Sequence, residues 1–271
     1  MPARSRLWPD PSVKPPYGAA EIDWGHPLAQ GLIGAWILNE GGGPPVDSVV
    51  GYRATSLGTG NSWAPLGAGG SFVIAHGGVA SVNTPHSAQY NPTTQATLAM
   101  GCTLDTHGGG MMCHGDYDAL TGVILEQSIA ADRAPSFYIN GSLQVSATDV
   151  SLPYEVGHVR HVAATYNGAG NSIIYIDGAA NNSAASTQSS ITAATGVMCL
   201  GGVDPSRTRY MDGTLIHAFF YRVALAAGLA LWLATEPYAM LRPIVRRRYF
   251  VPAAAGLSIP VAMHHYTMMR S

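Results

Sequence analysis

The chain has 271 residues, 11% of them charged, and a formal net charge of −2. This balance excludes the broad electrostatic field that attracts nucleic acid or an anionic membrane, so any partner has to be recognised locally. Cys102, Cys113 and Cys199 form no close pair and are too few for a disulfide framework or a four-ligand zinc site. No long apolar run follows the basic N-terminus, so we expect neither membrane insertion nor a secretory signal.

Residues 1–30 indicate an extended N-terminal arm, because prolines are frequent before Tyr17 and hydrophobic periodicity is weak. The arm carries the aromatic side chains of Trp8, Tyr17 and Trp24. Exposing them to water would be costly, so we expect the arm to lie on its own domain or on a neighbouring chain.

From residue 31 onwards, short runs rich in Val, Ile, Tyr and Phe are separated by Gly, Pro, Asn and Asp. This spacing is typical of an all-β sandwich or barrel. The predicted strands cover residues 31–38, 71–82, 96–104, 121–129, 136–147, 160–166, 172–178, 196–202 and 213–222. Three dipeptides can supply the positive φ angles of hairpin turns: Asn140-Gly141, Asn167-Gly168 and Asp177-Gly178.

Alternation assigns side chains to the faces of two of these strands. In residues 160–166 one face carries Val162, Ala164 and Tyr166. Residues 213–222 are apolar on both faces, which predicts a strand in the centre of a sheet. There the alternation assigns one face to Leu215, His217, Phe219 and Tyr221, and the other face to Ile216, Ala218 and Phe220.

One helix is predicted over about residues 224–236. Leu225, Leu229, Trp232 and Leu233 recur at helical spacing, and Pro237 ends the run. Residues 241–271 then form a basic and apolar C-terminal tail, whose first part, LRPIVRRRYF, concentrates Arg242, Arg246, Arg247 and Arg248.

Three segments resemble the laminin-G-like and pentraxin-like branch of the concanavalin A-like lectin/glucanase superfamily, in that family's order. They are GLIGAWILNEGGGPPVDSVVG, RHVAATYNGAGNSIIYIDGAA and YMDGTLIHAFFYRVALAAGLALWL, and together they cover about residues 31–235. The resemblance implies a jelly-roll sandwich over residues 31–240, between the two extended arms. WGHPLAQGL at 24–32 and EPYAMLRP at 236–243 look like a subgroup of such domains encoded by phages and prophages.

Calcium is the only cofactor that the sequence suggests. Where the family often places an acidic pair, this chain has Ile216 and His217, whereas Asp47 is retained. Asp116 and Asp118 lie two residues apart in what reads as a glycine-rich loop, where they offer further oxygen ligands. The alternative is a solvated turn in which these side chains cap their own backbone.

Catalysis is not expected. Retaining glucanases of this superfamily need Glu-x-Asp-x-Glu on one strand, so that two carboxylates face each other about 5 Å apart. The chain has no such triplet and no Gly-x-Ser-x-Gly nucleophile motif. A polysaccharide-degrading enzyme is therefore only the third hypothesis.

Sugar binding needs an exposed aromatic ring with polar groups beside it. Trp63 beside Asn61, in an apparent loop, fits this description best, and Tyr90 and Tyr117 are further candidates. The alternative is that Trp63 plugs one end of the sandwich.

The leading hypothesis is a non-enzymatic, virion-associated structural protein, either a capsid decoration or a fibre-type component. It would be made in the host cytoplasm, displayed on the virion surface, and joined to capsid or tail proteins, or to copies of itself, through its arms. The residues expected to bind partners are Trp8, Tyr17, Arg242, Arg246, Arg247 and Arg248. The alternative is a glycan-binding module acting at a cell surface. Neither hypothesis includes nucleic acid as a partner.

Overall fold

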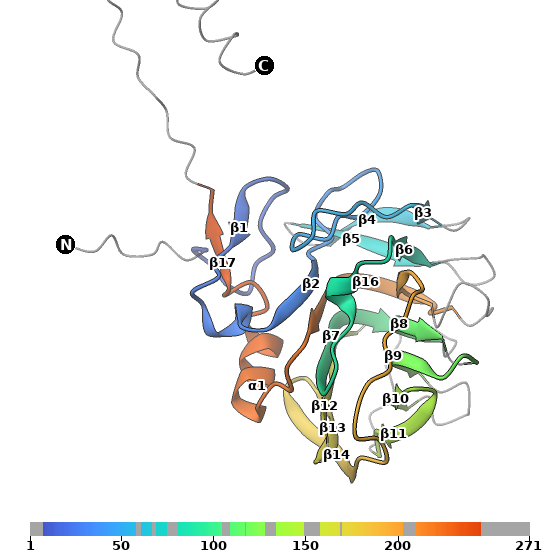
Figure 1. The fold of residues 1–271 in the computed structure, drawn as a ribbon. Helices are drawn as coiled ribbons and strands as arrows, with labels where there is room; N and C mark the ends of the chain where they lie inside the picture. The colour runs from blue at the N-terminus through green and yellow to red at the C-terminus, as the bar shows by residue number, and fades with distance from the viewer. Residues whose placement is uncertain are drawn as a thin grey trace, which may run out of the picture.

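The computed structural model describes residues 8–57, 61–66, 69–74, 81–104, 109–116, 118–127, 134–148, 158–168, 170–202 and 210–244. Within these residues two antiparallel sheets pack face to face, and one helix lies on the outer face of the larger sheet (Figure 1). This arrangement confirms the predicted all-β sandwich. None of the helices in the described segments is long and apolar enough to span a membrane.

The smaller sheet has seven strands. Their spatial order is β11 (Ser142–Ser146), β10 (Pro135–Ile139), β9 (Thr121–Gln127), β8 (Gly110–Asp116), β15 (Met198–Leu200), β6 (Val82–Thr84) and β3 (Ser56–Leu57). Strand β8 replaces part of the predicted glycine-rich loop. A Cβ atom on Gly115 would lie 2.3 Å from the Thr121 carbonyl oxygen, so glycine here permits close strand pairing rather than marking a loop.

The larger sheet orders seven strands as β14 (Ala179–Ala185), β13 (Asn171–Ile176), β12 (Val159–Asn167), β7 (Gln95–Leu104), β16 (Gly213–Tyr221), β5 (Gly69–Ile74) and β4 (Ser62–Leu66). An eighth strand, β2 (Leu32–Trp36), pairs with the far half of β16. Strand β16 thus has partners on both sides, as its apolar faces predicted. Strand β14 was not predicted, because its alanines, asparagines and serines lack strand character.

The main core fills the space between the two sheets. Val162, Ala164 and Tyr166 all enter it, as predicted, and meet residues of the smaller sheet such as Val123 and Phe137. A second core lies on the opposite face of the larger sheet. There Phe219 and Tyr221 are covered by residues of the helix and of both ends of the described chain.

The predicted face of Leu215 is wrong. Strand β16 contains a bulge, since Leu215 pairs with Cys102 and His217 with Gly101, and Ile216 has no partner in this register. The extra residue reverses the alternation, so Leu215 enters the main core, whereas His217 faces the opposite side. Composition cannot reveal such a shift, because both faces of the strand are apolar.

Two of the three predicted dipeptides have the positive φ angles expected of hairpin turns. Both residues of Asn140-Gly141 and of Asp177-Gly178 have positive φ angles, between 50° and 81°. In the third dipeptide only Gly168 does, with φ 53°.

The helix α1 (Ala227–Thr235) confirms the predicted helix, with Leu233 fully buried. The described arm packs on its own domain, where β1 (Ala20–Ile22) pairs with β17 (Leu241–Pro243) in a two-stranded sheet. The Trp8 amide donates to the Leu241 carbonyl, at 2.8 Å, so both ends of the described chain lie side by side. Two short 3-10 helices are η1 (Pro27–Ala29) and η2 (Ala88–Tyr90).

Candidate functional site

The aromatic residues first considered for sugar binding are separated by the fold. Trp63 lies in strand β4, not in a loop, and its half-buried ring packs edge-on against Phe72, with ring centres 5.1 Å apart. Its indole N–H donates to the carbonyl of Gly43 at 2.8 Å. The half-buried Asn61 precedes this strand, and Tyr117 lies outside the described residues.

Tyr90 and Asp47 are fully buried, so Tyr90 is not the predicted exposed sugar platform, and the oxygens of Asp47, the predicted calcium ligand, accept hydrogen bonds from the protein. The Tyr90 hydroxyl donates to one oxygen of Asp47 at 2.5 Å. The other oxygen accepts from the backbone amides of Ala35 and Val49, both at 2.9 Å. Burial raises the pKa of both side chains, and the pair ties η2 to the loop that follows β2.

The Asp116 carboxylate caps its own turn. One oxygen accepts from the backbone amides of Asp118 and Ala119, at 2.8 and 2.9 Å. This is the solvated turn that stood as the alternative to a calcium loop. Across the described residues, no three His, Cys, Asp or Glu side chains come together as metal ligands.

The residues predicted to bind partners differ in their surroundings. Trp8 is half-buried and packs against the second core, whereas the side chain of Tyr17 is 55% exposed. Arg242 forms an ion pair within the chain, described below. Arg246, Arg247 and Arg248 lie outside the described residues.

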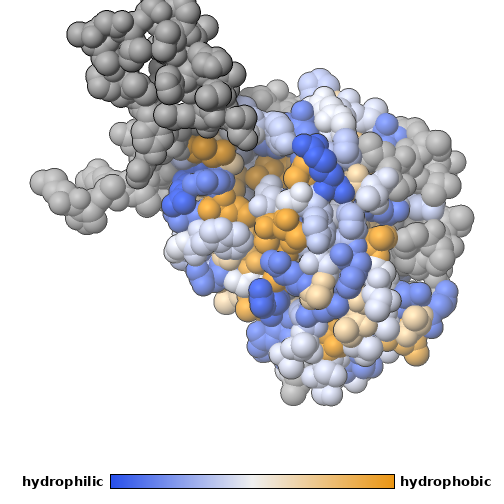
Figure 2. Space-filling view, turned by 45° about the horizontal axis from the view of Figure 1, so that its top comes forward, coloured by the Kyte–Doolittle hydropathy of each residue, from blue (hydrophilic) through white to orange (hydrophobic). Residues whose placement is uncertain are grey.

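A cleft of about 300 Å³ opens where the two-stranded sheet meets the loop after β2. Its apolar walls come from Ile22, Ile37, Val49 and Leu241. Figure 2 shows apolar surface among hydrophilic groups on this side of the molecule. Trp24 stands at the rim with 52% of its surface exposed, a large fraction for an indole in a folded domain.

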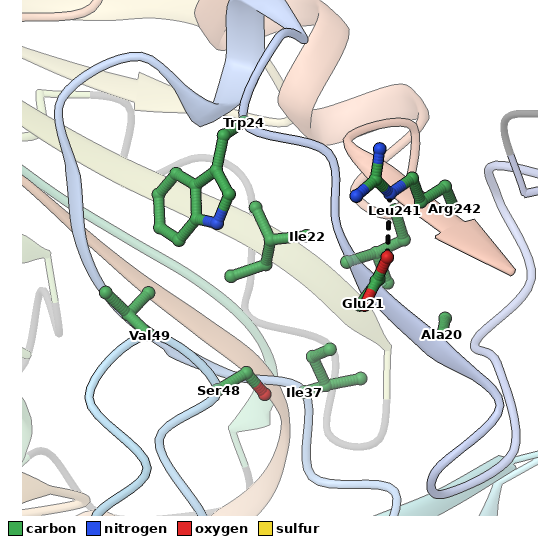
Figure 3. A pocket seen from close by; sticks show the side chains of 9 residues that line it. All are labelled: Ala20, Glu21, Ile22, Trp24, Ile37, Ser48, Val49, Leu241 and Arg242. Atoms are coloured by element: carbon green, nitrogen blue, oxygen red, sulfur yellow. Dashed lines mark hydrogen bonds and ion pairs between the residues drawn. The ribbon is translucent and has the colours of Figure 1, made fainter. Parts of the chain in front are cut away.

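Polar groups lie across the cleft from this indole (Figure 3). Glu21 and Arg242 are directly opposite each other in the pairing of β1 with β17, and their side chains form an ion pair of 2.9 Å. Asp23 approaches the same guanidinium at 3.9 Å. The cleft therefore combines an exposed indole face with charged hydrogen-bonding groups on one rigid ribbon.

Little in the sequence indicates this cleft. The sequence predicts Trp24 only as an apolar anchor of the arm, and Glu21 and Arg242 are 221 residues apart in the chain. The one usable signal was an aromatic residue flanked by acidic residues in a segment without strand periodicity.

A second hollow, of about 330 Å³, lies on the outer face of the larger sheet, beside the arm. Its lining includes Ser12, His161, Asp177, His217, Thr235 and Tyr238. Burial lowers the pKa of His161 to about 4, and burial likewise lowers the pKa of His217. Both imidazoles are therefore neutral at neutral pH.

The fold is a sandwich of two antiparallel sheets with two surface hollows. The family model described as the concanavalin A-like lectin/glucanases superfamily matches residues 76–228, more than half of the chain. The chain belongs to this superfamily, as the three sequence segments predicted. A comparison with curated proteins gives no match.

Solved structures share the fold at low sequence identity. The binding domain of Paraclostridial Mosquitocidal Protein 1 is 12% identical, with a TM-score of 0.61, over 76% of this chain and 52% of that one. The botulinum neurotoxin type C structure is 15% identical, with a TM-score of 0.58, over 76% and 51%. This chain thus spans about half the length of these two structures.

Domain 4 of AbnA, an extracellular arabinanase from Geobacillus stearothermophilus, is covered almost completely. It is 14% identical, with a TM-score of 0.56, over 80% of this chain and 99% of that domain. The sandwich described here therefore corresponds to a whole domain of that enzyme.

Proposed function

We propose that this chain is a non-enzymatic glycan-binding module whose binding site is the cleft beside Trp24. The observation that carries the proposal is the half-exposed Trp24 indole facing the Glu21–Arg242 ion pair across an apolar cleft. The C–H groups of a sugar ring stack on an indole face, while its hydroxyl groups bind carboxylate and guanidinium groups.

The size and shape of the cleft agree with this class of ligand. Its volume of about 300 Å³ is at the small end of ligand pockets, so it suits one or two sugar rings rather than a buried chain. The Gln30 side chain donates to the carbonyl of Trp24 at 2.9 Å, which holds the backbone of the platform in place. A platform ordered before binding loses less entropy on binding.

The relatives support a binding role. One structure is domain 4 of AbnA in complex with arabinotriose, and another concerns botulinum neurotoxin type C and two ganglioside molecules. Both proteins share the sandwich, so the same scaffold can present a carbohydrate site.

Binding without catalysis is part of the proposal. A retaining glycosidase needs two carboxyl groups about 5 Å apart, one to protonate the leaving group and one to attack. Glu21, which lines this cleft, and the neighbouring Asp23 both approach the guanidinium of Arg242 instead. Incubating bound glycan with the protein should therefore release no shorter sugar.

The experiment that tests the site is a glycan array followed by calorimetry on the ligands it selects. Trp24→Ala should weaken binding about tenfold or more, because a lost stacking contact of about 1.4 kcal/mol corresponds to a factor of ten. Trp63→Phe is the matched control, since Trp63 already packs on Phe72. If Trp63→Phe abolishes binding and Trp24→Ala does not, the site lies at strand β4.

We propose further that the module is displayed on a virion surface and held there by its terminal segments. Support comes from the resemblance of residues 24–32 and 236–243 to phage-encoded domains. The structure adds that these segments pack together, with the Asp23 amide donating to Met240 at 2.8 Å. Two chain ends that leave the domain side by side suit attachment to one partner surface.

A pull-down with phage capsid and tail proteins tests the display. Removing residues 1–7 and 245–271 should abolish capture by those proteins and leave glycan binding unchanged. Capture that survives this truncation would place the attachment on the sandwich, and the role of the terminal segments would be withdrawn.

A further inference from the structure

Two histidines face each other across a glycine on the outer face of the larger sheet. His161 of β12 and His217 of β16 are both register partners of Gly101 in the intervening strand β7. They lie in the second hollow, away from the Trp24 cleft. The glycan-binding proposal makes no use of them.

Gly101 makes room for the two rings. A Cβ atom at this position would lie 2.6 Å from Cε1 and 2.7 Å from Nε2 of His217. Any larger residue would therefore displace that imidazole. Without a side chain between them, the two rings approach to 5.5 Å between centres, with planes tilted by 40°.

Three imidazole nitrogens at this place have no hydrogen-bond partner: Nδ1 and Nε2 of His161 and Nε2 of His217. Both side chains are only 5% exposed. A buried polar atom without a partner is unfavourable, so several at one point indicate a bound ion or water.

The fourth imidazole nitrogen already has a hydrogen-bond partner, as is typical of a metal-binding histidine. Nδ1 of His217 lies 3.2 Å from the hydroxyl of Tyr238. Metal-binding histidines usually hold their second nitrogen in such a hydrogen bond, which fixes the ring and leaves the other nitrogen for the ion.

Charges of both signs surround the hollow. Asp177 lines it, accepts from the backbone amide of His161 at 2.8 Å and forms an ion pair with Arg160 at 2.6 Å. The ammonium of Lys14 is nearby, but it points to the carbonyl oxygens of Leu38 and Ile216.

We propose that His161 and His217 together bind a divalent transition-metal ion of the Zn²⁺ or Cu²⁺ class. Imidazole nitrogen suits these ions, whereas calcium prefers oxygen. With nitrogen–metal distances of about 2.0–2.1 Å, two rings on one tetrahedral ion have centres about 5 Å apart, close to the spacing seen here. Water in the hollow completes the coordination.

The test compares wild type with His161→Phe, which keeps a ring of similar size and removes both nitrogens. Calorimetry with Zn²⁺ at pH 7 should show at least tenfold weaker binding at one site in the variant. Electron paramagnetic resonance of added Cu²⁺ should show nitrogen coupling from two imidazoles in wild type and lose it in the variant. Gly101→Ala should also weaken Zn²⁺ binding, although it removes no ligand.

The chain has ten histidines, so a control for other sites is essential. His86→Phe removes one ring of the His86–His114 pair, whose nitrogens are 3.4 Å apart, and should leave this Zn²⁺ site unchanged. If wild type and His161→Phe bind Zn²⁺ equally and give the same Cu²⁺ spectrum, the hollow holds water and the proposal fails. Should the variant not fold, the ¹⁵N shifts of the His161 and His217 rings in wild type decide, because they must move on adding Zn²⁺.

Discussion

The buried ammonium group of Lys14 donates a hydrogen bond to the carbonyl oxygen of Ile216, 2.5 Å away and 202 residues later in the chain. Ile216 is the bulged residue of β16, so the arm supplies a donor at the point where the sheet register shifts. The same ammonium donates to Leu38 at 3.0 Å. Lys14 therefore joins the arm to β16 and to the segment that follows β2.

Replacing Lys14 by Ala should destabilise the protein and loosen the arm. Two buried carbonyl groups lose a donor, each at a cost of about 1–3 kcal/mol. Part of this cost is offset because the variant no longer buries an ammonium group, whose burial lowers the pKa of Lys14 to about 7. Urea unfolding should show a loss of about 2 kcal/mol or more. Limited proteolysis should also cut earlier within residues 8–16. Unchanged cleavage in Lys14→Ala would mean that Trp8 and the carbonyl of Pro11, which accepts from the Tyr238 amide at 3.0 Å, suffice to hold the arm.

Stability should fall between pH 6.5 and pH 4. Burial, with a smaller contribution from His86, lowers the pKa of His114 to about 4, whereas an unfolded histidine titrates near 6.5. Between these values the unfolded chain binds more protons, so stability present above pH 6.5 is lost as the pH falls, by up to about 3 kcal/mol. His161 acts in the same direction, because its pKa is also lowered to about 4.

Thermal melts across this pH range measure the effect. His114→Phe should be less stable at neutral pH, yet its stability should change less between pH 6.5 and pH 4. Equal slopes in the variant and wild type would show that other groups dominate the acid response.

Mild oxidation should join Cys113 to Cys199. The sequence offers no close pair, but the structure places these residues directly opposite each other in β8 and β15. Opposite Cβ atoms of antiparallel strands lie about 4.5–5.5 Å apart, so a small shift brings them within the reach of a disulfide. Mass spectrometry after diamide treatment and digestion should find this pair linked. Cys102 lies in the other sheet, and a link involving it would contradict the register.

Truncations at the two ends of the chain should differ in their effect on stability. Removing residues 245–271 should leave the melting temperature unchanged, because the pairing of β1 with β17 and the bond from the Ile244 amide to Ala19, at 2.9 Å, are both retained. Removing residues 1–23 should destabilise the fold, since β1, Lys14 and Trp8 are lost together. Differential scanning calorimetry distinguishes the two, and a stable protein without residues 1–23 would show that the arm is dispensable.

Local sequence patterns determined most of the architecture. Period-two alternation in residues 160–166 and apolar faces in residues 213–222 predicted β12 and β16, the two strands that flank β7. The dipeptides Asn140-Gly141 and Asp177-Gly178 predicted hairpin turns. These features depend on residues adjacent in the chain, so a sequence contains them directly.

Only the tertiary structure decided where the candidate sites lie. Glu21 meets Arg242, and His161 meets His217 across Gly101, because strands distant in sequence pair in one particular register. A single bulge at Ile216 reverses which side of the sheet its neighbours face, and neither composition nor periodicity encodes it. The strands were predictable because they are local, whereas the sites depend on long-range register, which only the folded chain defines.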